Sequence, residues 1–314
     1  VTPHVRRSMA YAAAIVHGRP SRELAVFGIT GTNGKTTTTQ LLDSIVTSSG
    51  RNCSVIGTLG GAHTTPESTD LQRQLRALVD QSVDVVALEV SSHALDQHRV
   101  DATEFAVAAF SNLTPDHLDF HKDMDSYFEA KIKLFDGRAG VEVINIDDPW
   151  GARLADQRPD PIRVSLSDVT IGKESLAGTR FIWRGLDAWV PLPGRMNVAN
   201  ALMAAESARV LGLNEIDIVE GLASAPAVPG RMQTVLSNNM ADIEQPRPTV
   251  VVDYSHTPDS IQLALATLRA VAPGAQLSIV FGCGGDRDQQ KRPLMGRAAE
   301  LGAQLLVVSN TTPE

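Results

Sequence analysis

A lysine and a run of threonines follow a glycine-rich turn in the segment GITGTNGKTTTT, residues 28–39. An apolar run at residues 24–30 predicts a strand before the turn, and a helix is expected after it, over residues 36–48. Glycines let such a turn bend tightly, so that backbone N–H groups can point at phosphate oxygens. Lys35 can place its charge on the β- and γ-phosphates of a nucleotide, and Thr36 can bring a hydroxyl to Mg²⁺. The spacing G-T-N-G-K-T is shorter than the strict phosphate-loop pattern, but its strand–turn–helix context indicates a nucleotide site.

Two further side chains, a glutamate and a histidine, could take part in metal binding. Glu89 ends an apolar run and His117 follows the next one. Lys131 lies in a helix-like segment with Tyr127 and Phe128 near one face, where it could pair with a glutamate or extend its amine to solvent. Ligands of open α/β sheets gather at the carboxyl ends of strands, where Glu89 is expected. Mg²⁺ prefers oxygen ligands, so a histidine ligand would be unusual on chemistry alone. Taken singly, each of these residues also has an ordinary structural role, and the residues alone leave a metal site open.

The elements that would position these side chains alternate between strand-like and helix-like segments, which predicts a parallel α/β sheet. In the first half the strands are expected at residues 24–30, 84–92, 105–113 and 141–148, and the helices at 36–48, 70–82 and 125–136. Further on we expect short strands within 180–193, around a turn at 185–187, and helices at 197–211 and 215–224. A second α/β series is expected from strands at 249–256, 276–285 and 303–310 and helices at 258–271 and 292–302.

Length, charge and cysteine usage limit the classes of protein that fit. The 314 residues suffice for about two domains, and the net charge of −8 disfavours nucleic acid as a partner, because phosphate binding needs clustered Lys and Arg. We see neither a long apolar run for a membrane span nor a signal peptide, and expect a cytoplasmic protein with no membrane partner. Cys53 and Cys283 lie far apart and predict two reduced, structural thiols.

Several longer motifs occur in one order along the chain. After GTNGKTTTT come TTPES (64–68), EVSSHALDQHRV (89–100), NLTPDHLDFH (112–121), YFEAKIKLF (127–135), LPGRMNVANALMA (192–204), VPGRMQ (228–233), VDYSHTPDS (252–260) and FGCGGDRDQQKRPLMG (281–296). This series resembles the Mur ligase family, and within it the ligases that add a diamino acid to UDP-N-acetylmuramoyl-L-Ala-D-Glu. The resemblance covers roughly Arg19 to Ser309. It implies an α/β fold, with a P-loop-type parallel-sheet ATP-binding central domain followed by a partial Rossmann-like C-terminal domain.

The resemblance also implies roles for individual residues. The implied catalytic residues are Lys35, Glu89, His117 and Lys131. The implied nucleotide site consists of Gly31, Thr32, Asn33, Gly34, Lys35, Thr36, Thr37, Asn197, Asn200, Arg231 and Asp253, with His256 and the loop 284–287 on the same side. The implied metal ligands are Thr36, Glu89, His117 and Lys131, the lysine as a carbamate. The implied substrate-binding residues are Thr64, Thr65, Ser91, Gln97 and Arg99.

The implied activity is that of an ATP-dependent amide-bond ligase in peptidoglycan precursor synthesis. A carboxylate is a poor acyl donor, because it would have to expel oxide. ATP would phosphorylate the γ-carboxylate of the D-glutamate to an acyl phosphate, which the amine of a diamino acid would then attack. Lys35, Arg231 and Mg²⁺ would offset the repulsion between the carboxylate and the triphosphate. The resemblance thus implies ATP and Mg²⁺ as cofactors, UDP-muramoyl-dipeptide and a diamino acid as partners, and a monomer.

The chain departs from the family pattern at both ends, and we expect it to be truncated there. We expect a remnant of an N-terminal uridine-nucleotide domain at residues 1–22, the central domain at 23–229 and a partial C-terminal domain at 230–314. Diaminopimelate-specific members carry Asp-Asn-Pro-Arg where this chain has SNTTPE, residues 309–314, so neither diaminopimelate nor lysine is assigned. Two alternatives stay open. One is another ligase of the superfamily, such as a folylpolyglutamate or cyanophycin type synthetase, and the other is a truncated, non-catalytic ATP-binding paralogue.

Overall fold

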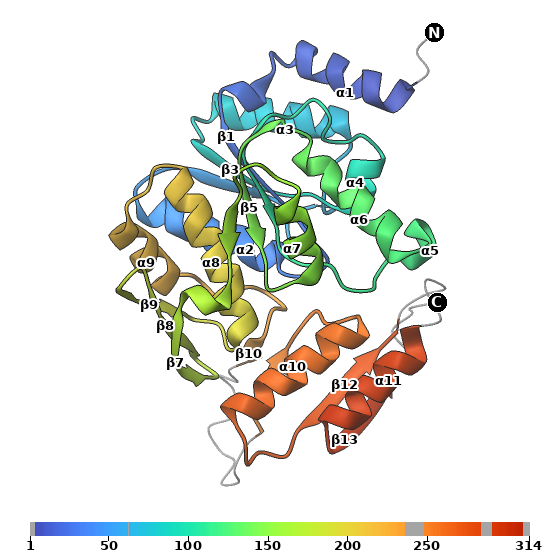
Figure 1. Ribbon diagram of the computed structural model, residues 1–314, viewed down its shortest axis with the longest axis vertical. Coiled ribbons are helices and arrows are strands. Elements are labelled where there is room, and N and C mark those ends of the chain that lie inside the picture. Colours follow the sequence, from blue (N-terminus) through green and yellow to red (C-terminus); the bar gives the residue numbers. More distant parts are fainter. Residues whose placement is uncertain (1–3, 62, 236–247, 284–290, 310–314) are drawn as a thin grey trace.

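A computed structural model of the chain describes residues 4–61, 63–235, 248–283 and 291–309 (Figure 1). Its centre is a six-stranded sheet in which all neighbouring strands run parallel, in the order β2-β3-β1-β4-β5-β6. This is the predicted α/β class with a parallel central sheet. The strands are β1 (Ala25–Thr30), β2 (Cys53–Ile56), β3 (Val85–Glu89), β4 (Phe105–Phe110), β5 (Ala139–Asn145) and β6 (Ile162–Val164).

Helices cover both faces of this sheet, and the strand side chains alternate between the two faces. Phe27 and Ile29 of β1 belong to one core cluster, whereas Val26 belongs to a second cluster on the other face. Burial on both faces explains why the strands read as continuous apolar runs in the sequence. On the first face lie α2 (Lys35–Ser48), α8 (Arg195–Val210) and α9 (Glu215–Ala223). On the second lie α3 (Ser68–Asp80), α4 (Ser92–Asp96), α6 (Met124–Ile132) and α7 (Pro149–Asp156).

Smaller elements complete this part of the fold. Helix α1 (Val5–Val16) packs on α3, and α5 (Leu118–His121) packs on α6. Strands β7 (Thr170–Ser175), β8 (Gly178–Trp183) and β9 (Leu186–Val190) form an antiparallel sheet against α9. The turn between β8 and β9 consists of Arg184 and Gly185, with a φ of 81° at Gly185, so the turn expected at 185–187 begins one residue earlier and Leu186 and Asp187 already belong to β9. Short 3₁₀ helices are formed by Pro20–Arg22, Lys133–Phe135 and Leu166–Asp168.

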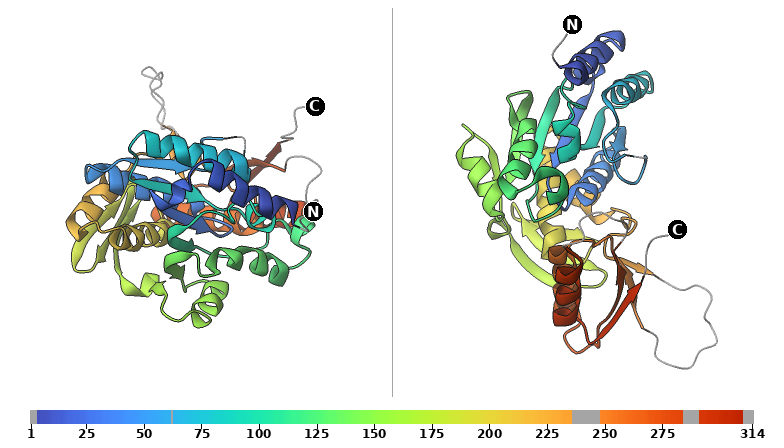
Figure 2. Two further views of the ribbon diagram at one scale, coloured as in Figure 1. Left: turned by 90° about the horizontal axis from the view of Figure 1, so that it is seen from above. Right: turned by 90° about the vertical axis from the view of Figure 1, so that its right-hand side faces the viewer.

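The described residues from 230 onward, called the C-terminal unit below, lie against the end of the large sheet at which its strands finish (Figures 1 and 2). We call residues 4–229 the large unit. The C-terminal unit contains α10 (Pro258–Val271), α11 (Lys291–Gly302) and two small sheets. Strands β10 (Gln233–Val235) and β11 (Val250–Val252) pair antiparallel, and β12 (Ser278–Gly282) and β13 (Leu305–Ser309) pair parallel.

One part of the predicted second α/β series is therefore wrong. The strand expected at 249–256 is β11, which pairs with β10 and does not join β12 and β13 in the described residues. Its three consecutive valines have no alternation that would fix a partner or a register, so the sequence pattern could not choose between the two pairings.

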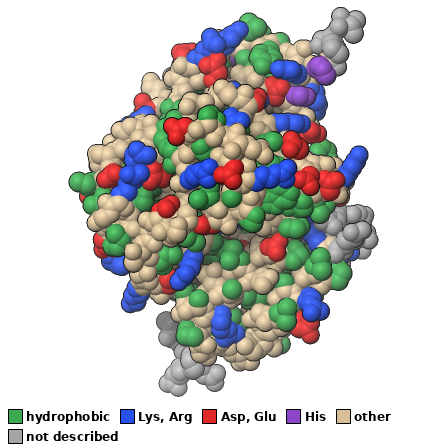
Figure 3. All heavy atoms as spheres, viewed as in Figure 1, with side chains coloured by type: hydrophobic (Ala, Val, Ile, Leu, Met, Phe, Trp, Pro, Cys, Tyr) green, Lys and Arg blue, Asp and Glu red, His purple; other side chains and the backbone are tan. Residues whose placement is uncertain are grey.

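The surface of the molecule carries charges of both signs. On the face shown in Figure 3, Lys and Arg side chains are interspersed with Asp and Glu, and hydrophobic side chains are frequent on the C-terminal unit. Elsewhere on that unit, Val280 and Val308 of the small parallel sheet are 70% and 64% exposed. The two faces of this sheet are thus much less covered than those of the large sheet, whose β3 is buried throughout.

Candidate active site

The turn between β1 and α2 has the geometry of a phosphate loop. Gly31 and Gly34 have φ values of 148° and 89°, and a side chain at Gly34 would collide with Asn200. Lys35 folds back over the loop, and its Nζ donates to the carbonyl oxygens of Gly31 and Thr32 at 2.8 and 2.9 Å. Burial lowers the pKa of Lys35, although Glu89 and Asp116 act in the opposite direction. The loop is therefore built around a lysine that already lies where phosphate charge would arrive.

Glu89 ends β3 directly opposite the start of α2. Its carboxylate is 1% exposed and accepts a hydrogen bond from the Thr36 hydroxyl at 3.0 Å. It also accepts from the backbone N–H of Thr58 at 2.9 Å and from the Thr58 hydroxyl at 3.1 Å. Gly57 allows this approach, because a side chain there would collide with Glu89. The backbone and two threonines thus fix the carboxylate beside the first turn of the loop helix.

Lys131 reaches the same loop from behind. It lies on α6, is 1% exposed, and its Nζ donates to the Gly31 carbonyl oxygen at 2.8 Å. The Nζ also lies 4.4 Å from the centre of the Tyr127 ring. Burial, and next the charge of Lys35, hold the pKa of Lys131 well below its usual value. These surroundings favour a neutral amine.

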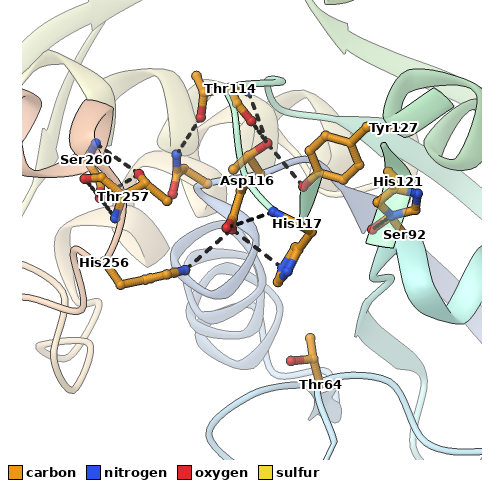
Figure 4. Close-up of polar contacts among 12 residues, drawn as sticks. Thr64, Ser92, Thr114, Asp116, His117, His121, Tyr127, His256, Thr257 and Ser260 are labelled. Carbon is orange, nitrogen blue, oxygen red and sulfur yellow. Dashed lines mark hydrogen bonds and ion pairs between the residues drawn. The ribbon is translucent and has the colours of Figure 1, made fainter. Parts of the chain in front are cut away.

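Asp116 and His117 form the third part of the site, in the loop after β4 (Figure 4). Nε2 of His117 lies 3.5 Å from Asp116 Oδ2. Burial lowers the pKa of His117 to about 4, although Asp116 raises it. Burial alone would raise the pKa of Asp116, but the contacts with His256, His117 and Lys291 outweigh it and hold that pKa below the usual range. At neutral pH the pair is therefore a carboxylate beside a neutral imidazole.

The side chains around His117 link it to the phosphate loop. His121 stacks on the Tyr127 ring, with ring centres 4.8 Å apart, and its Nε2 lies 2.9 Å from the Ser92 hydroxyl. The Thr32 hydroxyl lies 3.3 Å from the Tyr127 hydroxyl. Burial lowers the pKa of His121 to about 4. Tyr127 therefore touches the loop, the lysine and the histidines at once.

The opposite side of the site comes from α8 and the C-terminal unit. Asn197 and Asn200 share one face of α8, and Asn200 Nδ2 donates to Asn197 Oδ1 at 3.2 Å. Arg231 donates to the Thr36 hydroxyl at 3.2 Å and lies 4.5 Å from the centre of the Tyr254 ring. Asp253 accepts from the Met232 backbone N–H at 2.8 Å. The two units therefore meet at Thr36.

A cavity of about 510 Å³ lies between the two units and brings most of the expected residues together. Fourteen of them line it: Thr32, Asn33, Gly34, Lys35, Thr36, Thr37, Thr64, Glu89, Ser91, His117, Asn197, Asn200, Arg231 and Asp253. His256 lines it as well, while the loop 284–287 lies outside the described residues. Gly31 and Lys131 lie behind the loop and do not line it.

Three residues expected to bind substrate are likewise absent from the lining of this cavity. The Thr65 hydroxyl donates to the Glu89 carbonyl oxygen at 2.8 Å. Arg99 donates to the Thr65 carbonyl oxygen at 2.9 Å and to the Gln97 side chain at 2.8 Å, and it pairs with Glu67 at 2.9 Å. These residues form a polar cluster beside Ser91, next to the cavity.

Two oxygen-bearing side chains at the cavity fit Mg²⁺. The Thr36 hydroxyl and the Glu89 carboxylate are adjacent oxygen donors at the cavity, as Mg²⁺ requires. Among the described residues no group of three or more His, Cys, Asp or Glu side chains is arranged to hold a metal ion. The pair therefore fits a cation that takes its other ligands from phosphates and water.

The structure adds residues that sequence reasoning did not select. Thr58 holds Glu89, and Asp116 faces the C-terminal unit. Tyr254 lies beneath Arg231, and Met196 and Met232 line the cavity. For Asp116 a signal existed, because it belongs to the same motif as His117; Thr58 follows a short half-buried strand and has no such signal.

A parallel sheet whose first strand leads through a glycine turn into a helix, opposite a buried glutamate, defines the class of phosphate-loop α/β proteins. The family model of the Mur ligase middle domain matches residues 29–208. The family model described as Mur ligase, glutamate ligase domain, matches residues 230–314. The chain therefore belongs to the Mur ligase family.

Individual relatives agree with this assignment. The UDP-N-acetylmuramoyl-L-alanyl-D-glutamate–2,6-diaminopimelate ligase of Geobacter metallireducens is 41% identical over 335 residues, in a match that covers 98% of this chain and 64% of the relative. The chain thus spans a little less than two thirds of the length of this relative. A solved structure of a UDP-N-acetylmuramoyl-L-alanyl-D-glutamate–2,6-diaminopimelate ligase has a TM-score of 0.70 at 30% identity, over 98% of this chain and 66% of that one.

A more distant structure shares the fold alone. Folylpolyglutamate synthase of Mycobacterium tuberculosis, complexed with ADP and AMPPCP, has a TM-score of 0.73 at 20% identity and covers 98% of this chain and 79% of that one. Separately, none of the helices in the described part of the chain is both long and apolar enough to cross a bilayer.

Proposed function

We propose that this chain is the ATP-binding part of a ligase that joins a diamino acid to UDP-N-acetylmuramoyl-L-Ala-D-Glu in peptidoglycan precursor synthesis. The observation that carries the proposal is the cavity itself, in which Lys35, Thr36 and Glu89 on one wall face Arg231 and Asp253 on the other. The 41% identity to a ligase of that name supports the substrate class. The same name supports 2,6-diaminopimelate as the diamino acid.

The first step in the proposed reaction is phosphoryl transfer from ATP to the γ-carboxylate of D-glutamate. Backbone N–H groups of the loop would bind the phosphates, and Lys35 would turn from the Gly31 and Thr32 carbonyl oxygens toward them. Arg231 would approach from the C-terminal unit and neutralise charge on the transferred group. Asn197 and Asn200 would bind the adenine side of the nucleotide. Mg²⁺, when bound at Thr36 and Glu89 with His117 nearby, would shield the charge of the phosphate oxygens.

Lys131 is proposed to act as a carbamate. A carbamate would form when the neutral amine of Lys131 adds to CO₂, which makes an N–C bond and releases one proton, and the burial of Lys131 favours the neutral amine. The carbamate would bring an anion behind the loop, where Lys35 and Lys131 now share the Gly31 carbonyl oxygen. A second cation could then be oriented by Lys131, Glu89 and His117.

The second step is attack of the diamino acid on the acyl phosphate. The C–O bond of the acyl phosphate breaks as the amide C–N bond forms, and inorganic phosphate leaves. Thr64 and Ser91 line the cavity and are proposed to bind the muramoyl peptide, together with Thr65, Gln97 and Arg99 in the adjoining polar cluster. The proposal includes a cytoplasmic monomer, as expected for an enzyme that acts on a soluble nucleotide-linked precursor.

Phosphate release from ATP and Mg²⁺ in the presence of UDP-N-acetylmuramoyl-L-Ala-D-Glu would test the proposal. Diaminopimelate, lysine and no amino acid form the three arms. Release that depends on diaminopimelate is the expected result. Release with lysine alone would correct the amino acid, and tight ATP binding with no release in any arm would favour a non-catalytic nucleotide-binding chain.

A further inference from the structure

Asp116 is a buried carboxylate at the junction of the two units (Figure 4). It lies in the loop between β4 and α5 and is 5% exposed. Within the large unit its described contacts are the His117 backbone N–H at 3.0 Å and the His117 ring at 3.5 Å. A carboxylate buried to this extent needs cationic or hydrogen-bonding partners. Both contacts come from one neighbouring residue, and the charges of Lys35 and Lys131 act on Asp116 without a hydrogen bond or ion pair among the described contacts.

The other partners of Asp116 come from the C-terminal unit. Oδ2 lies 3.4 Å from His256 Nε2, and Oδ1 lies 3.7 Å from Lys291 Nζ. The second ring nitrogen of His256 lies 3.0 Å from the Tyr254 carbonyl oxygen, which can only accept. Both ring nitrogens of His256 therefore face oxygen atoms, one in each unit. Asp116 thus gathers the His256 ring and the Lys291 ammonium group.

These two partners of Asp116 lie at the starts of two different helices. His256 lies just before α10, and Lys291 is the first residue of α11. One carboxylate of the large unit therefore holds the ends of both helices of the C-terminal unit. Asp116 and His256 also line the cavity that contains Lys35, so the contact spans the cavity beside the phosphate loop.

We propose that Asp116 is a positioning residue whose carboxylate holds His256 and Lys291, and with them the C-terminal unit, in the closed arrangement over the phosphate loop. Its role in turnover rests on the proposed ligase function. The closed arrangement is a separate property that can be measured without any reaction. If the units part, Asp116 exchanges the Lys291 ammonium group and the His256 ring for water, so these contacts favour closure.

Distances between the units test this closure directly. The two native cysteines are first removed by Cys53→Ser and Cys283→Ser. Spin labels are then attached at Glu129→Cys on α6 and Glu300→Cys on α11. Pulsed electron resonance measures the distance between the two labels, and hence between the two units. We expect Asp116→Asn to increase the fraction of long distances about tenfold relative to the otherwise unchanged chain. The matched control is Asp119→Asn, which removes the same charge from an exposed residue three positions along and should leave the distances unchanged.

Further variants guard against a folding defect in Asp116→Asn. His256→Gln should produce the same shift, and in the Asp116→Asn background it should add nothing more, because the contact is already lost. Melting curves check that each variant is folded. Unchanged distances in folded Asp116→Asn, or equal effects of Asp116→Asn and Asp119→Asn, would overturn the proposal.

Steady-state kinetics distinguish positioning from a purely structural role. If the unsubstituted chain shows ligase activity, Asp116→Asn should lower kcat about tenfold with little change in KM for ATP. Asp116→Glu should restore part of the lost kcat. Lengthened distances with an unchanged kcat would overturn the positioning role. If the unsubstituted chain has no ligase activity, the proposed function fails, while the distance measurement still decides the closure.

Discussion

The two walls of the cavity differ in how their polar side chains are held. On the wall formed by the large unit, Glu89 is 1% exposed and accepts three hydrogen bonds, from Thr36 and Thr58. On the wall formed by the C-terminal unit, Tyr254 is 58% exposed and the His256 side chain 46% exposed. The first wall is fixed by its own core, whereas the second depends on contacts across the cavity.

This difference has a physical consequence for phosphoryl transfer. Side chains that are already fixed when the substrate binds need no reorganisation during the reaction. Side chains on a separate unit can approach after the substrate has bound and complete the site. The buried wall would therefore set the chemistry, and the exposed wall would set how often a complete site forms. Substitutions in the two walls should separate these effects.

The largest effect is expected in the buried wall, from Glu89→Gln. The amide keeps the size of the side chain but removes the charge beside Thr36, where a cation would bind. We expect kcat/KM to fall roughly 10²- to 10³-fold, as for the loss of a group that stabilises transition-state charge. Initial rates of phosphate release over a range of ATP concentrations measure it. Glu129→Gln, on the exposed side of α6, is the control, and equal losses in both variants would contradict the assignment of Glu89.

The next effect concerns Lys131 and is a gain in stability. In CO₂-free buffer, Lys131→Met removes a buried amine, while Lys35 still donates to the shared Gly31 carbonyl oxygen. We expect the free energy of unfolding at pH 7 to rise by about 1–3 kcal/mol, since the desolvated amine costs about that much. Denaturant titration measures this change.

The same variant should change the pH dependence of stability. The pKa of Lys131 is lowered in the folded chain, so between that value and 10.5 the unfolded chain binds more protons. Stability of the unsubstituted chain therefore rises as pH approaches 10.5 from below, and Lys131→Met should lose the part of this rise that Lys131 contributes, while Lys35, whose pKa is also lowered, keeps its own part. The exposed Lys122→Met is the control; an undiminished slope in Lys131→Met would show that other groups produce it.

The exposed wall should respond less strongly, through Arg231→Lys. A lysine keeps the charge but loses the planar group that lies over Tyr254 and reaches Thr36. We expect KM for ATP to rise about tenfold, with a smaller change in kcat, because the buried wall stays intact. If kcat falls as far as in Glu89→Gln, then the buried wall does not set the rate of the chemical step by itself, contrary to the proposal.

Sequence patterns could predict the buried wall better than the exposed one. The strand, glycine turn and helix around Lys35 are adjacent in the chain, so their spacing alone indicates a phosphate loop. Continuous apolar runs also indicated the strands β1, β3, β4 and β5, because these strands are covered on both faces. The sequence pattern does not predict the strand β2, which is only four residues long, or the helix α1, which lies in the segment expected to be a domain remnant.

Local sequence patterns could not predict the contacts across the cavity. Asp116 stands beside His117, Asp119 and His121 in one motif, and nothing in the motif shows which side chain faces the C-terminal unit. The pairing with His256 joins residues 140 positions apart and depends on how the units pack. The resemblance named His117 of that motif, while the structure adds the neighbouring carboxylate.

The smallest effect is expected behind the buried wall, at His121. Burial lowers its pKa to about 4 in the folded chain, against the ordinary value of 6.5, so between these values the unfolded chain binds more protons. This histidine therefore removes stability as pH falls from 6.5 to 4. His121→Gln cannot titrate and retains a hydrogen-bonding side chain near Ser92, so its free energy of unfolding should fall less steeply over that range. His63→Gln, at an exposed position, should leave the slope unchanged. A slope in His121→Gln as steep as in the unsubstituted chain would mean that His117 alone carries the acid sensitivity of this wall.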